Sequence, residues 1–191
     1  DLSDHMGHTG GIARFGDCVY ITDDEGLDVF LLEDLLSDSG TMTKQGEVKT
    51  FNNPAYCYIY GDHIIVGSFH REGPYNTPAW EHVTSPAGDK NTSMALVFEL
   101  DGEQSFGVTP TPIAAISTPS QVQGICVTDD GDVIASTSWG FNHSYLYMYD
   151  GDCVTRAETP VTVTEEIAVP LYYLDSTSLS HTITAPPMSE E

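Results

Sequence analysis

A strand–turn–strand pattern occurs three times in the sequence, and this repetition is the feature that most constrains the fold. The three segments are GGIARFGDCVYITDD (10–24), PAYCYIYGDHIIVGSFH (54–70) and QGICVTDDGDVIASTSWG (123–140). Each places a Gly-Asp or Asp-Gly turn between two short runs of apolar and β-branched residues, which is the signature of a β-hairpin. We therefore expect an all-β chain built on three hairpins.

Further strands are expected after each hairpin. Candidate third strands are LDVFLL (27–32), ALVFELDG (95–102) and YLYMYDG (145–151). Fourth strands are clearest in TPIAAIST (111–118) and LSHTITA (179–185), while LEDLLSDSG (32–40) indicates a single helical turn. Units of four strands and about 40–50 residues are typical of β-propeller blades. The whole chain is thus predicted to be one partial β-propeller domain with about three four-stranded blades, at 8–52, 53–118 and 119–186.

The chain ends on APPMSEE (185–191), a phrase similar to those that precede the second and third hairpins. This similarity predicts that residues 186–191 lead into a further blade. Propellers close rings of four to eight blades, and an open ring exposes sheet edges that favour aggregation. We therefore expect a fragment whose remaining blades lie in the same chain, or a chain that completes its ring by self-association.

Several phrases resemble a known type of protein. They are HTGGIARFGDCVYITDDEGLDVFLLEDL (8–35), HIIVGSFHREG (63–73), PSQVQGICVTDDGDVIASTSWG (119–140) and APPMSEE. These phrases are similar to an uncharacterised group of secreted bacterial β-propellers. More distantly, the chain resembles the YVTN, NHL, strictosidine-synthase-like and gluconolactonase-like superfamily. The resemblance implies a six- to seven-bladed ring, and its gluconolactonase-like members imply a channel metal held by acidic and Asn ligands.

The charge of the chain restricts its partners and its location. The 29 acidic and 6 basic residues give a formal net charge of −23. A nucleic-acid partner is not expected, because phosphate binding needs Lys and Arg. No apolar run is long enough to cross a bilayer, so membrane insertion is not expected either. An acidic surface suits a soluble extracellular or cell-envelope protein, and the alternative interpretation is a cation-binding surface.

Blade geometry predicts which loops share a face. In a propeller, the loops that enter the innermost strand and those that join the second strand to the third open around the channel mouth. The 71–93 segment is a long insertion of the second kind, and long loops on a rigid scaffold are frequent binding sites. The residues expected on this face are His8, Asn53, His70, Tyr75, Trp80, His82, Gln121, Gln123, Trp139, Asn142, His143 and Glu190.

Two functions fit this face. The first is a binding module for a small molecule, a glycan or a protein partner, since no nucleophile elbow or paired acid–base carboxylates are present. The alternative is a divalent-metal-dependent hydrolase or lactonase at the channel. Its candidate ligands are Asp23, Asp24, Asn53 and Glu190, and calcium is the cation that such oxygen ligands favour. No other cofactor is expected. The four cysteines lack a C-x-x-C pair, and a Cys57–Cys126 bridge is left open.

Overall fold

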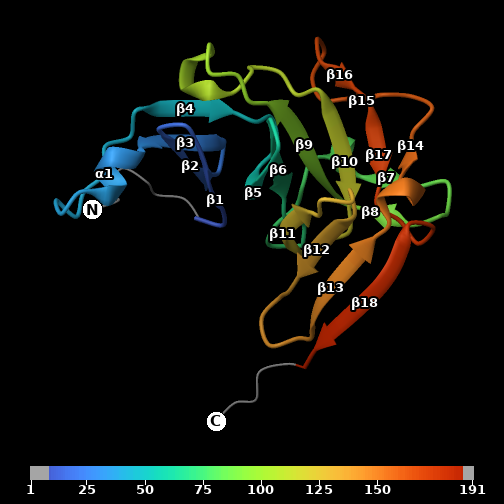
Figure 1. Ribbon diagram of the computed structural model, residues 1–191. Coiled ribbons are helices and arrows are strands. Elements are labelled where there is room, and N and C mark those ends of the chain that lie inside the picture. Colours follow the sequence, from blue (N-terminus) through green and yellow to red (C-terminus); the bar gives the residue numbers. More distant parts are fainter. Residues whose placement is uncertain (1–8, 187–191) are drawn as a thin grey trace.

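Three sheets, none closed on itself, form the body of the protein, which a computed structural model describes over residues 9–186 (Figure 1). The first sheet has the order β1-β2-β3-β4, with all neighbours antiparallel. Its strands are β1 (Ile12–Phe15), β2 (Cys18–Asp23), β3 (Gly26–Leu31) and β4 (Gly46–Lys49). A helical turn, α1 (Leu32–Leu36), follows β3, as the sequence predicts.

The third sheet repeats this arrangement with the order β11-β12-β13-β18. Its strands are β11 (Val122–Val127), β12 (Val133–Thr137), β13 (Ser144–Tyr149) and β18 (Leu179–Ala185). The all-β class and the three predicted hairpins are thus confirmed. The hairpins turn at Gly16, Gly61 and Gly131, each with a positive φ that favours glycine.

The second sheet has six strands in the order β14-β17-β10-β9-β6-β5, two more than the sequence predicted. The predicted four are β5 (Pro54–Tyr60), β6 (His63–Ser68), β9 (Ser93–Glu99) and β10 (Ala114–Thr118). The other two come from the segment between β13 and β18. In that segment β17 (Leu171–Tyr173) pairs parallel with β10, and β14 (Thr155–Arg156) pairs with β17. The extra strands cover the edge of β10, which would otherwise lack a pairing partner on that side.

Smaller elements lie in the connections. Two short hairpins are formed by β7 (Val83–Thr84) with β8 (Lys90–Asn91), and by β15 (Val161–Thr162) with β16 (Ala168–Val169). The 3₁₀ helices are η1 (Ala79–Glu81), η2 (Ser105–Gly107) and η3 (Gly151–Cys153). Within residues 9–186, no helix has both the length and the apolar character needed to span a membrane.

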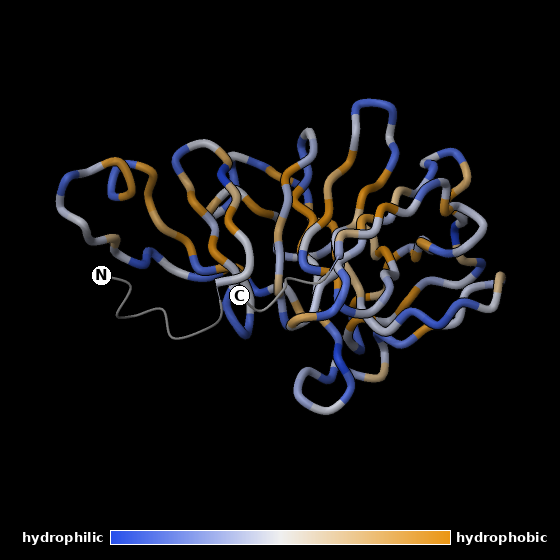
Figure 2. Tube along the Cα trace, turned by 90° about the horizontal axis from the view of Figure 1, so that it is seen from below, coloured by the Kyte–Doolittle hydropathy of each residue, from blue (hydrophilic) through white to orange (hydrophobic). Residues whose placement is uncertain are grey.

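The second sheet packs between the other two and uses both of its faces. Ile64 and Val66 belong to the core shared with the first sheet, whereas Ile65 belongs to the core shared with the third. This division follows from the two-residue period of a strand, which sends neighbouring side chains to opposite faces. Figure 2 shows apolar residues along the strands and hydrophilic residues in the loops between them.

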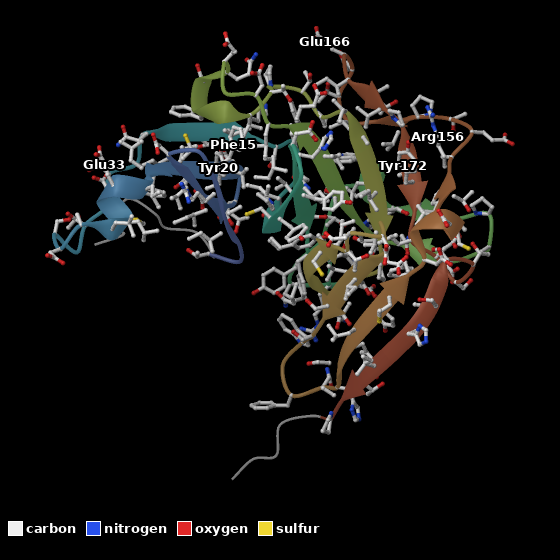
Figure 3. The ribbon with its side chains drawn as sticks, in the orientation of Figure 1. Phe15, Tyr20, Glu33, Arg156, Glu166 and Tyr172 are labelled. Atoms are coloured by element: carbon white, nitrogen blue, oxygen red, sulfur yellow. The ribbon has the colours of Figure 1, made fainter. Side chains whose placement is uncertain are left out.

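One contact ties the first sheet to the loop after β9. The Tyr20 hydroxyl donates a hydrogen bond of 2.6 Å to the Phe106 carbonyl, and Phe15 lies beside Tyr20 (Figure 3). This contact adds a hydrogen bond to the apolar packing between the first and second sheets.

Candidate functional site

A cavity of about 420 Å³ lies where loops of all three sheets meet. Its walls come from residues before β1, between β2 and β3, before and at the start of β5, after β6, along β11 and after β12. The lining residues are Thr9, Gly10, Asp24, Asn53, Pro54, Ala55, Phe69, Pro74, Tyr75, Asn76, Thr77, Gln123 and Trp139. Most of these residues lie in the loops that enter the first strand of a sheet or follow its second strand, the two kinds of loop that the sequence predicts on one face. They meet because the first strand of each sheet starts at the end where the antiparallel second strand stops.

The structure brings together four of the residues expected on the ligand face, namely Asn53, Tyr75, Gln123 and Trp139. The metal candidate Asp24 lies in the same wall. The side chains of Asp24, Asn53 and Gln123 are exposed. The Gln123 amide is oriented by a hydrogen bond of 3.2 Å from its Nε2 to the Ser138 carbonyl. The cavity thus offers a carboxylate and two amides as hydrogen-bonding groups for a ligand.

The same cavity is also lined by a cluster of three aromatic rings, those of Phe69, Tyr75 and Trp139. The ring centroids are 5.6 Å apart for Phe69 and Tyr75, 5.9 Å for Phe69 and Trp139, and 5.6 Å for Tyr75 and Trp139. The guanidinium carbon of Arg71 lies 4.0 Å from the centroid of the Trp139 ring. Edge-on aromatic contacts and a cation over an indole are both attractive, so the cluster holds Trp139 in one orientation.

Tyr75 is presented by a small turn at the start of the 71–93 insertion. The backbones of Arg71 and Tyr75 exchange hydrogen bonds of 2.8 and 3.0 Å. Between them Gly73 adopts a φ of 95°, and the Asn76 side chain bonds both the amide and the carbonyl of Gly73. Tyr75 nevertheless keeps 40% of its surface exposed. The turn therefore orders the backbone while leaving the ring available for contact.

His70 and His82 lie behind the cavity wall and do not line it. His70 Nδ1 and His82 Nε2 are each 2.9 Å from the Thr77 hydroxyl, which donates to the Thr92 carbonyl. Burial, and then the proximity of His82, lower the pKa of His70. The two histidines therefore support the insertion.

The remaining candidates have other surroundings. Trp80 packs against the core between the first and second sheets. Gln121 adopts a φ of 64°, and its backbone links His70 to Ser138. The Asn142 amide closes a turn onto Trp139, and His143 lies 3.2 Å from the Ala185 carbonyl on an exposed surface. His8 and Glu190 fall outside the described residues.

The metal candidates do not assemble in the part of the chain that the structure describes. Across residues 9–186, no group of three His, Cys, Asp or Glu side chains could hold a metal ion. Asp23 belongs to β2, while Asp24 and Asn53 line the cavity. A calcium site that includes Glu190 stays a prediction. All four cysteines are free, so the Cys57–Cys126 bridge is not formed.

Sequence reasoning missed Phe69, Arg71, Asn76 and Thr77. Phe69 and Arg71 flank His70 directly, and their position after the second strand would have placed both on the same face. Asn76 and Thr77 carried no comparable signal, because their position depends on how the insertion folds.

Comparisons with protein-family models, with curated proteins and with solved structures found no match to this chain.

Proposed function

We propose that this protein is a carbohydrate-binding module whose ligand occupies the cavity between the three sheets. The observation that carries the proposal is the meeting of an aromatic cluster with a carboxylate and two amides, supplied by three separate sheets and their loops. A sugar ring has an apolar face, which stacks on aromatic rings, and hydroxyl groups, which need both donors and acceptors. Trp139 and Tyr75 supply the aromatic rings for stacking. Asp24, Asn53 and Gln123 supply the hydrogen-bond donors and acceptors for the hydroxyl groups.

The architecture that fits this function is a β-propeller. We propose that the three sheets are three blades, with β1, β5 and β11 as their innermost strands. Two observations support this: each sheet follows the same antiparallel order for its main four strands, and the strand-entry loops converge on one cavity. Additional blades, in the same chain or in a second copy, would complete the ring. The extracellular or cell-envelope location expected from the acidic charge remains part of the proposal.

The direct test is binding to an array of neutral glycans, followed by calorimetry on any glycan that is retained. We expect Trp139→Ala to weaken binding about tenfold or more. The loss of one stacked aromatic side chain removes buried apolar surface that contributes about 1.5–3 kcal/mol to the binding free energy. The matched control is Phe141→Ala, which removes an aromatic ring that is 68% exposed and does not line the cavity. If no glycan is retained, or if Trp139→Ala and Phe141→Ala bind equally well, the proposal is wrong.

A further inference from the structure

Glu81 is a buried carboxylate in the 71–93 insertion, and its surroundings are unusual for a charged group. Its side chain is fully buried, and one carboxylate oxygen, Oε2, accepts a hydrogen bond from the Ser68 hydroxyl. The other oxygen, Oε1, is buried without a hydrogen-bond partner. Asp28, which is equally buried, instead has the Lys44 ammonium 2.6 Å away. Among residues 9–186, no basic group lies within ion-pair distance of Glu81.

The position of Glu81 connects it to the cavity. Ser68 is the last residue of β6 and directly precedes Phe69 of the aromatic cluster. Glu81 ends η1, four residues after Thr77 in the cavity wall. The Ser68–Glu81 contact thus fastens the wall formed by residues 74–77 to the sheet that carries Phe69.

The rest of the insertion is anchored independently. Asn91 donates hydrogen bonds of 2.9 Å to both the Ser117 hydroxyl and the Leu174 carbonyl, and Asp89 accepts two from Ser176. The Thr77 hydroxyl keeps its own contacts to His70, His82 and the Thr92 carbonyl. A loss of the Glu81 contact would therefore loosen the cavity wall without detaching β7 and β8.

We propose that Glu81 is a proton-operated latch on the cavity: in its neutral form it holds the 74–77 wall against the second sheet, and in its ionised form it releases the wall. As a regulator of ligand binding, this latch rests on the function proposed above. The physical cause is desolvation, since a buried carboxylate without a cationic partner is strongly disfavoured in its charged form.

The titration of the site has a defined direction. Burial raises the pKa of Glu81 from its ordinary value of 4.5 to about 7, and the Ser68 hydroxyl and the Met94 backbone act in the opposite direction. A released wall would return Glu81 to water and to its ordinary pKa. The equilibrium constant for docking of the wall is therefore highest below about pH 4.5. It falls about tenfold per pH unit as the pH rises to about 7, and it is constant above that pH.

Other titratable groups near Glu81 are few. From β5, Tyr56 interacts with Glu81, and burial raises the pKa of Tyr56 well above the neutral range. On the insertion itself, His82 follows Glu81 and contacts Thr77 together with His70. Because these two imidazoles are ionisable groups beside the wall, a histidine variant is needed as a control.

The experiment follows the wall in the intact protein without ligand. Both tryptophans report on this region, because Trp80 lies in η1 and Trp139 in the aromatic cluster. We expect a pH-dependent change in tryptophan fluorescence that is complete near pH 7 in the natural protein and absent in Glu81→Gln, an uncharged replacement of nearly the same shape. At neutral pH, trypsin should cleave after Arg71 at least tenfold faster in the natural protein than in Glu81→Gln.

Two further variants control this result. Ser68→Ala removes the contact that fastens the wall, so the docked wall should be weaker at every pH and the transition should move to lower pH. His82→Gln should leave the transition in place. A transition that persists in Glu81→Gln, or disappears in His82→Gln, overturns the latch.

The glycan array, repeated at acidic and neutral pH, separates the two proposals. Weaker retention at neutral pH that Glu81→Gln restores supports both. A Glu81-dependent transition with no glycan retained overturns the carbohydrate function and leaves the latch standing. Retention that is equal at both pH values, with no fluorescence transition, overturns the latch alone.

Discussion

At the scale of single residues, the Tyr56 ring packs closely on Gly67 in the second sheet. The two residues lie directly opposite each other on β5 and β6, and Tyr56 is 2% exposed. A Cβ on residue 67 would lie 1.9 Å from Cζ of the Tyr56 ring. The absence of a side chain at Gly67 therefore makes room for the aromatic ring, an arrangement that stabilises glycines within sheets.

Gly67→Ala is accordingly predicted to destabilise the protein by about 1–3 kcal/mol, the usual cost of overpacking a core. Urea unfolding followed by circular dichroism measures this loss. Gly102→Ala is the matched control, because a Cβ there would meet nothing within 4 Å. Equal unfolding midpoints for the two variants would contradict the close approach of the Tyr56 ring.

At the scale of elements, two long connections that leave different sheets meet each other. The 71–93 insertion leaves the second sheet between β6 and β9, and the 150–178 connection leaves the third sheet between β13 and β18. The second connection contributes β17 to the second sheet. Asn91 joins the two connections through its bond to the Leu174 carbonyl, and a second bond ties it to Ser117 of β10. Asn91 is 4% exposed.

Asn91→Ala should therefore cost about 1–3 kcal/mol, because it leaves buried partners without a hydrogen bond. The free energy of unfolding in urea is the appropriate measure. Asn142→Ala, at an exposed position, should change it by less than about 0.5 kcal/mol. A loss for Asn91→Ala that is no larger than the loss for Asn142→Ala would show that the two connections are held by other contacts.

At the scale of the whole molecule, repulsion among carboxylates is the dominant electrostatic feature. Within residues 9–186, ion pairs join Lys44 to Asp28 and to Glu47, and the His63 imidazole lies 2.8 Å from the Asp62 carboxylate. Acidic groups such as Glu33 and Glu166 project from the periphery (Figure 3). With a net charge of −23, these charges repel one another in the compact state more than in the unfolded chain.

Added salt should therefore stabilise the protein. The Debye length falls from about 30 Å at 0.01 M salt to about 3 Å at 1 M, so NaCl screens this repulsion. We expect the Tm to rise by at least the 2–4 °C that correspond to about 1 kcal/mol in a chain of this size. Sucrose at equal osmolality controls for solute exclusion from the protein surface, and a Tm that NaCl raises no more than sucrose does would argue against the repulsion.

Local patterns in the sequence by themselves determined the three hairpins, the strand at Leu179–Ala185 and the helical turn at Leu32, because turn glycines and a two-residue apolar period act over a few residues. They also indicated Asn53, Tyr75, Gln123 and Trp139, since loop positions follow from strand order.

Only the tertiary structure decided the parallel pairing of β17 with β10, the ring contacts of Phe69 and the burial of Glu81. The sequence contains the same Glu81 whether it faces solvent or the second sheet. Its environment depends on which distant residues cover it, and contacts between residues far apart in the chain leave no periodic trace in the sequence.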